Sequence, residues 1–323
     1  MKKIGILFGK ENTFPQAFID RVNEKGNPDI LAESVLVEEV RMAKRSGYAV
    51  IIDRISQDVP FYRAYLKNAA ATGTAVVNNP FWWSADEKFF NNVLAEKIGV
   101  PVPKTVLLPS KRMPDDTSDE SFRNLKYPLN WDKIVDYLGG FPMYMKPHSG
   151  GGWKNVYKVN SIQELWKNYD ESGHLVMMLQ ENIEFDLYFR CYYVGKSVHI
   201  MPYEPRNPHH LRYFPETVTY DEDLLNQIER LVIKINEALG YDMNTVEFAV
   251  RDGIPYAIDF CNPAPDADLH SVGESNFNWI VEHAARMAIE RATERVAGSV
   301  NLTWGIFVKD GHTVNGPNNR ITK

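Results

Sequence analysis

The chain has 323 residues, of which 44% are hydrophobic and 12% aromatic, so it can bury the cores of about two globular domains. Its formal net charge of −6 argues against a general nucleic-acid-binding protein, because such a protein needs a basic face to displace counterions from phosphates. The two cysteines are too few for a disulfide framework and indicate a reducing compartment.

The first apolar run, residues 3–8, ends at Gly9-Lys10. It is shorter than the apolar region of a signal peptide and far shorter than a membrane span. We therefore expect a cytoplasmic protein without a membrane partner.

The first hundred residues alternate between strand and helix patterns. Buried strands are predicted at 3–8, 48–53 and 74–77, and helices at 14–24, 38–44, 61–71 and 85–98. The last of these helices has a plausible cap at Ser84, with Asp86 and Glu87 in its first turn. Alternation of this length favours a parallel sheet that helices cover on both faces.

The middle of the chain surrounds a glycine-rich loop. A stiff segment at 100–105 and a polar stretch at 109–132 favour a crossover and then a surface loop. The elements predicted next are a helix at 131–138, a strand at 142–147, the loop His148-Ser149-Gly150-Gly151-Gly152-Trp153, a strand at 156–159, a helix at 161–168 with a Ser161/Glu164 capping box, and a strand at 175–180.

The rest of the chain favours antiparallel hairpins packed with long helices. Hairpins are predicted at 187–201, turned at Gly195-Lys196, and around the turn at 251–253, and helices at 223–239 and 278–296. The polar tail from Lys309 resembles no functional motif. We expect an α/β protein whose C-terminal half is α+β.

Residues Val246 to Asp266 carry Glu247, Asp259 and Asn262 on two apolar runs around a turn. Carboxylate and amide oxygens are hard donors that suit Mg²⁺, which one or two carboxylates usually hold together with substrate phosphates. Acids at strand ends are more often simply solvated, so this pattern alone does not decide between a metal site and an ordinary hairpin.

Several upstream features suit a nucleotide. Glycines 150–152 allow backbone N–H groups to approach an anion closely, and Lys146 on the preceding strand can neutralise phosphate oxygens. Arg190 and Arg206 have the fork geometry that clamps a transferring phosphoryl group. Each feature also has an ordinary explanation as a glycine-rich hairpin, a surface lysine or a salt-bridge partner.

Six motifs in order resemble the ATP-grasp superfamily, especially its branch of ribosomal-protein glutamyl ligases and glutathione synthetases. The resemblance covers about residues 74 to 290. The motifs are TAVVNNP, ADEKFF with GVPVPKT, MKPHSGGGWKNV, LQENI, DLYFRCYYVGK and VEFAVRDGIPYAIDFCNPAPD. The resemblance implies an ATP-grasp fold with an N-terminal Rossmann-like pre-grasp domain (1–105), a small subdomain with the glycine-rich loop (106–185) and a large subdomain with the metal site (186–323).

The resemblance also assigns site residues. Those assigned to ATP are Lys88 and Lys146 for the α- and β-phosphates, Ser149, Gly150, Gly151, Gly152 and Trp153 for the loop over the triphosphate, Gln180, Glu181, Asn182 and Ile183 for the adenine hinge, and Asp186 for the ribose. Glu247, Asp259 and Asn262 would hold Mg²⁺, with Mn²⁺ as the alternative ion.

The sequence departs from the family pattern in two places. Asp259 and Asn262 are three residues apart where many members have two, so on a regular strand they would point to opposite faces. A bulge or a strand end near Cys261 would reconcile them. The family's arginine shortly before the first acid is missing, and we expect Arg190, Arg206 or Arg212 to supply that charge.

The resemblance implies an ATP-dependent, ADP-forming carboxylate–amine ligase that acts on small molecules or peptides through an acyl-phosphate, without nucleic acid, and that forms a homodimer. His209 and His210 are candidate bases for the amine or members of a solvated loop, and Arg54, Trp82 and Trp83 either shape the acid pocket or only pack. Two alternatives stay open: a small-molecule kinase on the same fold, and an ATP-binding regulatory or scaffold protein without turnover.

Overall fold

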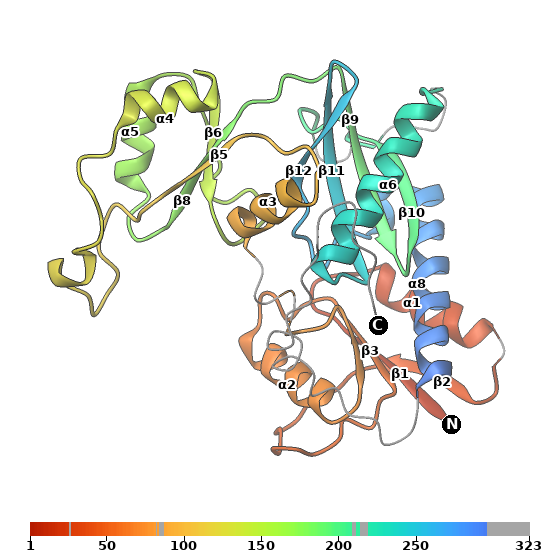
Figure 1. The fold of residues 1–323 in the computed structure, drawn as a ribbon. Coiled ribbons are helices and arrows are strands. Elements are labelled where there is room, and N and C mark those ends of the chain that lie inside the picture. Colours follow the sequence, from red (N-terminus) through yellow and green to blue (C-terminus); the bar gives the residue numbers. More distant parts are fainter. Residues whose placement is uncertain (26, 82, 84–86, 209–210, 214–218, 296–323) are drawn as a thin grey trace, which may run out of the picture. The chain divides into compact units, whose positions relative to one another are not determined.

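The computed structural model describes residues 1–295, except 26, 82, 84–86, 209–210 and 214–218. The chain divides into two compact units (Figure 1). Unit 1 comprises Met1–Asp86, Tyr188–Phe248 and Asp259–Lys323, and unit 2 comprises Glu87–Leu187 and Ala249–Ile258. The predicted division at residues 105 and 185 is not tested by this partition and stays a prediction.

The first sheet of unit 1 is parallel, as predicted, with the strand order β2-β1-β3-β4. Its strands are β1 (Lys2–Leu7), β2 (Ile30–Ser34), β3 (Val50–Asp53) and β4 (Ala75–Val77), with the helices α1 (Phe14–Glu24) and α2 (Pro60–Ala71) between them in the chain. On α1, Phe14, Phe18 and Val22 recur every four residues and are buried. This face packs in one core with β1 and the C-terminal helix α8 (Glu274–Glu294).

One prediction for this region is wrong, and one strand was not predicted. Residues 38–44 form no helix, and Val40 and Met42 are exposed. A segment this short without a buried apolar face lacks the packing that stabilises a helix in water. The strand β2 was not predicted from the sequence. Ile30–Ser34 is defined as a strand by its parallel pairing with β1, which the local sequence pattern does not reveal.

The second sheet has the order β10-β9-β11-β12. Its strands are β9 (Leu187–Val194), β10 (Ser197–Pro202), β11 (Met243–Arg251) and β12 (Ile254–Asp259). The predicted turn at Gly195-Lys196 is confirmed, with φ of 54° and 74° at the two residues. The boundary between the two units passes through the hairpin of β11 and β12.

Two helices of unit 1 end at glycines of positive φ. α6 (Glu222–Leu239) is capped by the Asp221 carboxylate and ends at the left-handed Gly240. The short α7 (Leu269–Val272), which the sequence did not predict, ends at Gly273, and α8 begins directly after it at Glu274, four residues earlier than predicted.

Unit 2 is built on the antiparallel sheet β5-β8-β6-β7. Its elements are α3 (Lys88–Lys97), β5 (Thr105–Leu108), the 3₁₀ helix η2 (Asp119–Phe122), α4 (Trp131–Leu138), β6 (Met143–Pro147), β7 (Tyr157–Val159), α5 (Ile162–Glu171) and β8 (Met177–Glu181). The helices α4 and α5 and the sheet share one apolar core. A parallel sheet in the first part of the chain and antiparallel sheets later match the predicted α/β and α+β classes.

Three details of unit 2 correct the sequence analysis. Glu87 is extended, so α3 begins at Lys88 and not at Ala85; the cap predicted at Ser84 lies outside the described residues. Ser161 caps α5 as predicted, but Glu164 accepts from the Asn160 N–H, one residue further back than a capping box requires. The supposed crossover ends in a strand, β5. No helix in the described part of the chain is long and apolar enough to cross a membrane.

Candidate functional site

The strand β12 ends at Asp259, and the chain leaves the sheet at Phe260. The buried Asn244 of β11 bridges this departure: its Nδ2 donates to the Phe260 carbonyl at 3.0 Å and its Oδ1 accepts from the Asn262 N–H at 3.0 Å. The side chain of Asn262 donates through Nδ2 to the Thr245 carbonyl at 3.2 Å. The strand end that the spacing of Asp259 and Asn262 requires is therefore confirmed.

Glu247 lies on β11 and is held by two side chains of β9. Arg190 Nη1 is 3.2 Å from Glu247 Oε1, and the Tyr188 hydroxyl donates to Oε2 at 2.6 Å. Burial, followed by the nearby Glu247 charge, raises the pKa of Tyr188 well above its usual value, so the phenol stays protonated and donates. Arg190 and Tyr188 thereby hold the two oxygens of the Glu247 carboxylate.

The donor chemistry of unit 1 fits a magnesium ion. Glu247 and Asp259 both act electrostatically on Tyr188, and the amide of Asn262 is anchored through its nitrogen, which leaves the oxygen as its metal-binding atom. No group of three or more His, Cys, Asp or Glu suited to a metal occurs among the residues that the structure describes. Two carboxylates and one amide oxygen form the kind of incomplete set that Mg²⁺ supplements with water and phosphate oxygens.

The three candidate arginines differ in their surroundings. Arg206 is exposed and donates from Nε to Glu204 at 2.6 Å. Arg212 donates to the Asn207 carbonyl at 2.9 Å and the Tyr203 hydroxyl at 3.3 Å. Arg190 lies against a predicted metal donor. His209 and His210 lie outside the described residues.

Lys146 on β6 is buried, with 9% of its surface exposed, and its Nζ is 3.5 Å from the carbonyl oxygen of Ile258. A buried ammonium group suits an anionic ligand group, because the opposite charge offsets the cost of its desolvation. Its environment suits the phosphate-binding role predicted for it.

Lys88 is the first residue of α3, and its N–H donates to the His148 carbonyl at 2.7 Å. The His148 ring connects two further segments: Nε2 is 3.1 Å from the Glu87 carboxylate, and Nδ1 is 3.1 Å from the Val176 carbonyl oxygen. His148 therefore ties the start of the glycine-rich loop to α3 and to the segment before β8. Sequence reasoning missed this function, since it depends on contacts from distant segments.

The loop from Ser149 to Trp153 is exposed throughout. Gly150 and Gly152 have φ of 93° and 70°, which only glycine adopts without strain, and an added Cβ would meet no atom within 4 Å at any of the three glycines. Backbone conformation therefore explains Gly150 and Gly152, whereas neither conformation nor packing inside unit 2 requires Gly151.

The predicted adenine hinge is partly occupied by internal contacts. The buried Gln180 side chain donates to Thr105 Oγ1 at 3.2 Å, which gives it a structural role. The Glu181 N–H donates to the Lys104 carbonyl at 2.9 Å, and its carboxylate pairs with Arg251 at 3.1 Å. An adenine edge would have to use the Glu181 carbonyl and the Ile183 N–H.

The remaining hinge residues differ in exposure. Asn182 is half-buried and the Ile183 side chain is buried. Asp186 is exposed, and its N–H donates to the Val250 carbonyl at 3.0 Å. The carboxylate of Asp186 is therefore accessible to a polar ligand group such as a ribose hydroxyl.

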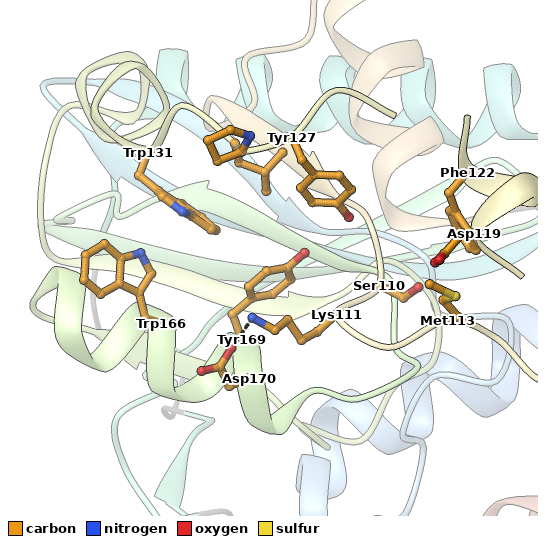
Figure 2. A pocket seen from close by; sticks show the side chains of 12 residues that line it. Ser110, Lys111, Met113, Asp119, Phe122, Tyr127, Trp131, Trp166, Tyr169 and Asp170 are labelled. Carbon is orange, nitrogen blue, oxygen red and sulfur yellow. Dashed lines mark ion pairs between the residues drawn. The ribbon is translucent and has the colours of Figure 1, made fainter. Parts of the chain in front are cut away.

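Unit 2 also contains a cavity of about 720 Å³ apart from these residues (Figure 2). Tyr127, Trp131, Trp166 and Tyr169 supply most of its aromatic lining, and Lys111 pairs with Asp170 at its edge. None of the predicted site residues lines it. The cavity is therefore not the predicted nucleotide site.

No protein-family model matches this sequence, and no curated protein matches it at the sequence level. Solved structures do match. A RimK domain ATP-grasp protein from Sphaerobacter thermophilus superposes with a TM-score of 0.63 at 16% identity, over 89% of this chain and 98% of that chain. The chain has the ATP-grasp fold.

Two ATP-grasp ligases illustrate the extent of the match. D-alanine–D-alanine ligase from Bacillus anthracis, complexed with ATP, gives a TM-score of 0.62 at 16% identity, over 91% of this chain and 98% of that chain. The ATP-grasp ligase PsnB, complexed with a minimal precursor, Mg and ADP, gives a TM-score of 0.58 at 13% identity, over 90% of this chain and 98% of that chain. The ATP-grasp fold predicted from six ordered motifs is thus confirmed over nearly the whole chain.

Proposed function

We propose that this protein is an ATP-dependent, ADP-forming carboxylate–amine ligase that acts through an acyl-phosphate and requires Mg²⁺. The observation that supports the proposal is a set of two carboxylates and an amide in unit 1: Glu247 lies on β11 beside Arg190, and Asp259 and Asn262 lie at and just after the end of β12. The ATP-grasp fold supports it, because neighbours with this fold have been solved with ATP and with Mg and ADP.

Glu247, Asp259 and Asn262 would hold the magnesium ion. When bound, the ion would neutralise charge on the ATP phosphates, so that a carboxylate oxygen can attack the γ-phosphoryl group in line. Arg190 lies close to Glu247 and would stabilise the anionic oxygens of the acyl-phosphate and of the tetrahedral species formed when the amine attacks.

Residues of unit 2 would position the nucleotide. Lys88 and Lys146 would neutralise the phosphates, and the exposed loop Ser149–Trp153 would cover them with backbone N–H groups. The base would meet the Glu181 carbonyl and the Ile183 N–H. Catalysis would come from positioning and electrostatic stabilisation, without a covalent enzyme intermediate.

The substrates that we propose are a carboxylic acid and an amine, either small molecules or parts of a peptide. The peptide option is supported by PsnB, which was solved with a minimal precursor. Mn²⁺ would be able to occupy the same site in place of Mg²⁺, since it also binds carboxylate and carbonyl oxygens.

Hydroxylamine trapping tests the proposal. Purified protein is incubated with Mg-ATP, hydroxylamine and a panel of acids, and the nucleotide product and the hydroxamate are measured. A ligase gives ADP and a hydroxamate, because hydroxylamine intercepts the acyl-phosphate. A kinase gives ADP without hydroxamate, and release of AMP and pyrophosphate would contradict the proposed chemistry.

A further inference from the structure

Five buried polar atoms of unit 1 have no hydrogen-bonding partner within the described part of the chain. They are Arg54 Nη1, Trp83 Nε1, Arg190 Nε, Tyr192 Oη and Tyr213 Oη. Buried polar groups in folded proteins nearly always have a partner, since an unmade hydrogen bond in the interior is costly. Four of the five, those other than Trp83 Nε1, call for a common explanation.

The four side chains occupy one neighbourhood. Arg190 and Tyr192 are two residues apart on β9 and therefore project from the same face of the strand. The Arg190 guanidinium lies 5.6 Å from the centre of the Tyr203 ring, and the Tyr203 and Tyr213 rings are 5.0 Å apart. A β-bridge joins Tyr203 to Tyr213.

Arg54 approaches the same group from the end of β3. Its guanidinium lies 5.0 Å from the centre of the Phe14 ring and donates to the Pro265 carbonyl. Phe14 and Tyr192 belong to one apolar core, and Tyr213 packs against it. Tyr192 is also within electrostatic reach of Arg54, Arg190 and Tyr213.

All four groups are hydrogen-bond donors in this setting. A guanidinium N–H cannot accept, and burial raises the pKa of Tyr192 and of Tyr213, so both phenols keep their protons. The missing partner must therefore offer acceptor oxygens.

The nearby acids are already engaged elsewhere. Glu11 accepts from Nε and Nη2 of Arg54, and Glu247 pairs with Nη1 of Arg190. Asp266 accepts from the Ser271 hydroxyl and the Asp268 N–H. The unmade bonds belong to the other atoms of the two guanidinium groups.

We propose that Arg54, Arg190, Tyr192 and Tyr213 bind a carboxylate group of the acid substrate, an assignment that rests on the proposed ligase function. A carboxylate supplies two oxygens with about four acceptor positions, which matches four donors, and its charge complements the buried guanidinium of Arg54 and the half-buried guanidinium of Arg190. The four donors would then form their hydrogen bonds only when the carboxylate binds. Leaving them without partners before binding destabilises the protein but keeps the anion site preformed.

Removal of single hydroxyl groups tests the site in the ligand-free protein. Tyr192→Phe and Tyr213→Phe delete unpartnered hydroxyls at nearly constant volume, so the melting temperature should stay the same or rise. The matched control is Tyr169→Phe. The Tyr169 hydroxyl donates to the Pro109 carbonyl at 2.8 Å, so its removal should lower the melting temperature. If Tyr192→Phe lowers the melting temperature as much as Tyr169→Phe, the hydroxyl has a structural partner such as a buried water, and the proposal is overturned.

Binding is tested by thermal-shift measurements in the absence of ATP. A panel of amino acids and dipeptides is used, and each acid is compared with its C-terminal amide. At least one acid should stabilise the wild-type protein more than its amide does. In Tyr192→Phe and Tyr213→Phe that acid should bind about tenfold more weakly, because one bond to a charged group is lost. No preference for acids over amides, or an unchanged affinity in both variants, would overturn the proposal.

The two proposals fail separately. If acids bind through these residues but no ADP or hydroxamate forms, the ligase function fails and the anion site stands. If hydroxamate forms with unchanged affinity for the acid in both variants, the ligase function stands and the anion site is wrong.

Discussion

Asn244 and Asn262 are joined by a hydrogen bond of 3.0 Å from the Asn262 N–H to the Asn244 Oδ1, across the point where β12 ends. Through Nδ2, Asn244 also donates to the Phe260 carbonyl and to Asn236 Oδ1 at 2.9 Å. One buried side chain thus replaces the sheet contacts that the chain loses after Asp259. This departure from the sheet would allow Asp259 and Asn262, three residues apart, to serve the one metal site that we propose.

Asn244→Ala should lower the free energy of unfolding by about 3 kcal/mol, because it leaves several buried polar groups without partners at a cost of roughly 1–3 kcal/mol each. Denaturation with urea measures the change. The control is Asn226→Ala on the exposed face of α6, which should alter stability by less than about 0.5 kcal/mol. Equal effects of the two substitutions would contradict the bridging role of Asn244.

Asp259→Asn should reduce Mg-dependent turnover by about 100-fold or more while the melting temperature stays unchanged, because it removes a ligand charge at constant volume. Turnover is followed as ADP release over a magnesium titration. Asp252→Asn in the turn of the same hairpin is the matched control and should behave as the wild type. Unchanged activity of Asp259→Asn would remove this residue from the metal site.

Lys146→Met should weaken ATP binding by about tenfold or more, since the buried ammonium loses its charge but keeps its apolar stem. Isothermal titration with ATP measures the affinity, and affinity for the acid substrate should change less. Lys158→Met, at an exposed position of the neighbouring strand β7, is the control. If both variants bind ATP equally well, Lys146 does not contact the nucleotide.

The sequence predicted elements that carry their own periodicity or turn residues and missed those that depend on neighbours. The helices α1 and α4 and the turn at Gly195-Lys196 agree with the predictions to within a residue. The strands β2 and β5 were missed, because each is defined by its pairing with another strand.

The candidate site shows the same division. Glu247, Asp259 and Asn262 could be chosen from their donor chemistry and from a family resemblance. The contacts of Arg190 with Glu247 and of Asn244 with Asn262 could not, since they join residues 57 and 18 positions apart. The wrongly predicted helix at 38–44 had the right residue types but no core to pack against.

The pH dependence of stability should reveal the contact between α1 and α8. Lys25 and Arg21 hydrogen-bond to Glu282 and hold the pKa of its carboxyl below the usual value. A lowered folded-state pKa stabilises the fold above the unfolded pKa, and the stabilisation disappears as the pH falls through the folded pKa. Glu282→Gln should therefore melt at a lower temperature than the wild type at pH 7, and the difference should vanish in the acid range below the normal glutamate pKa. Melting curves from pH 7 to pH 3 measure this, with Glu290→Gln on the exposed face of α8 as the control. A difference that stays the same from pH 7 to pH 3 would show that Glu282 contributes through packing and not through its charge.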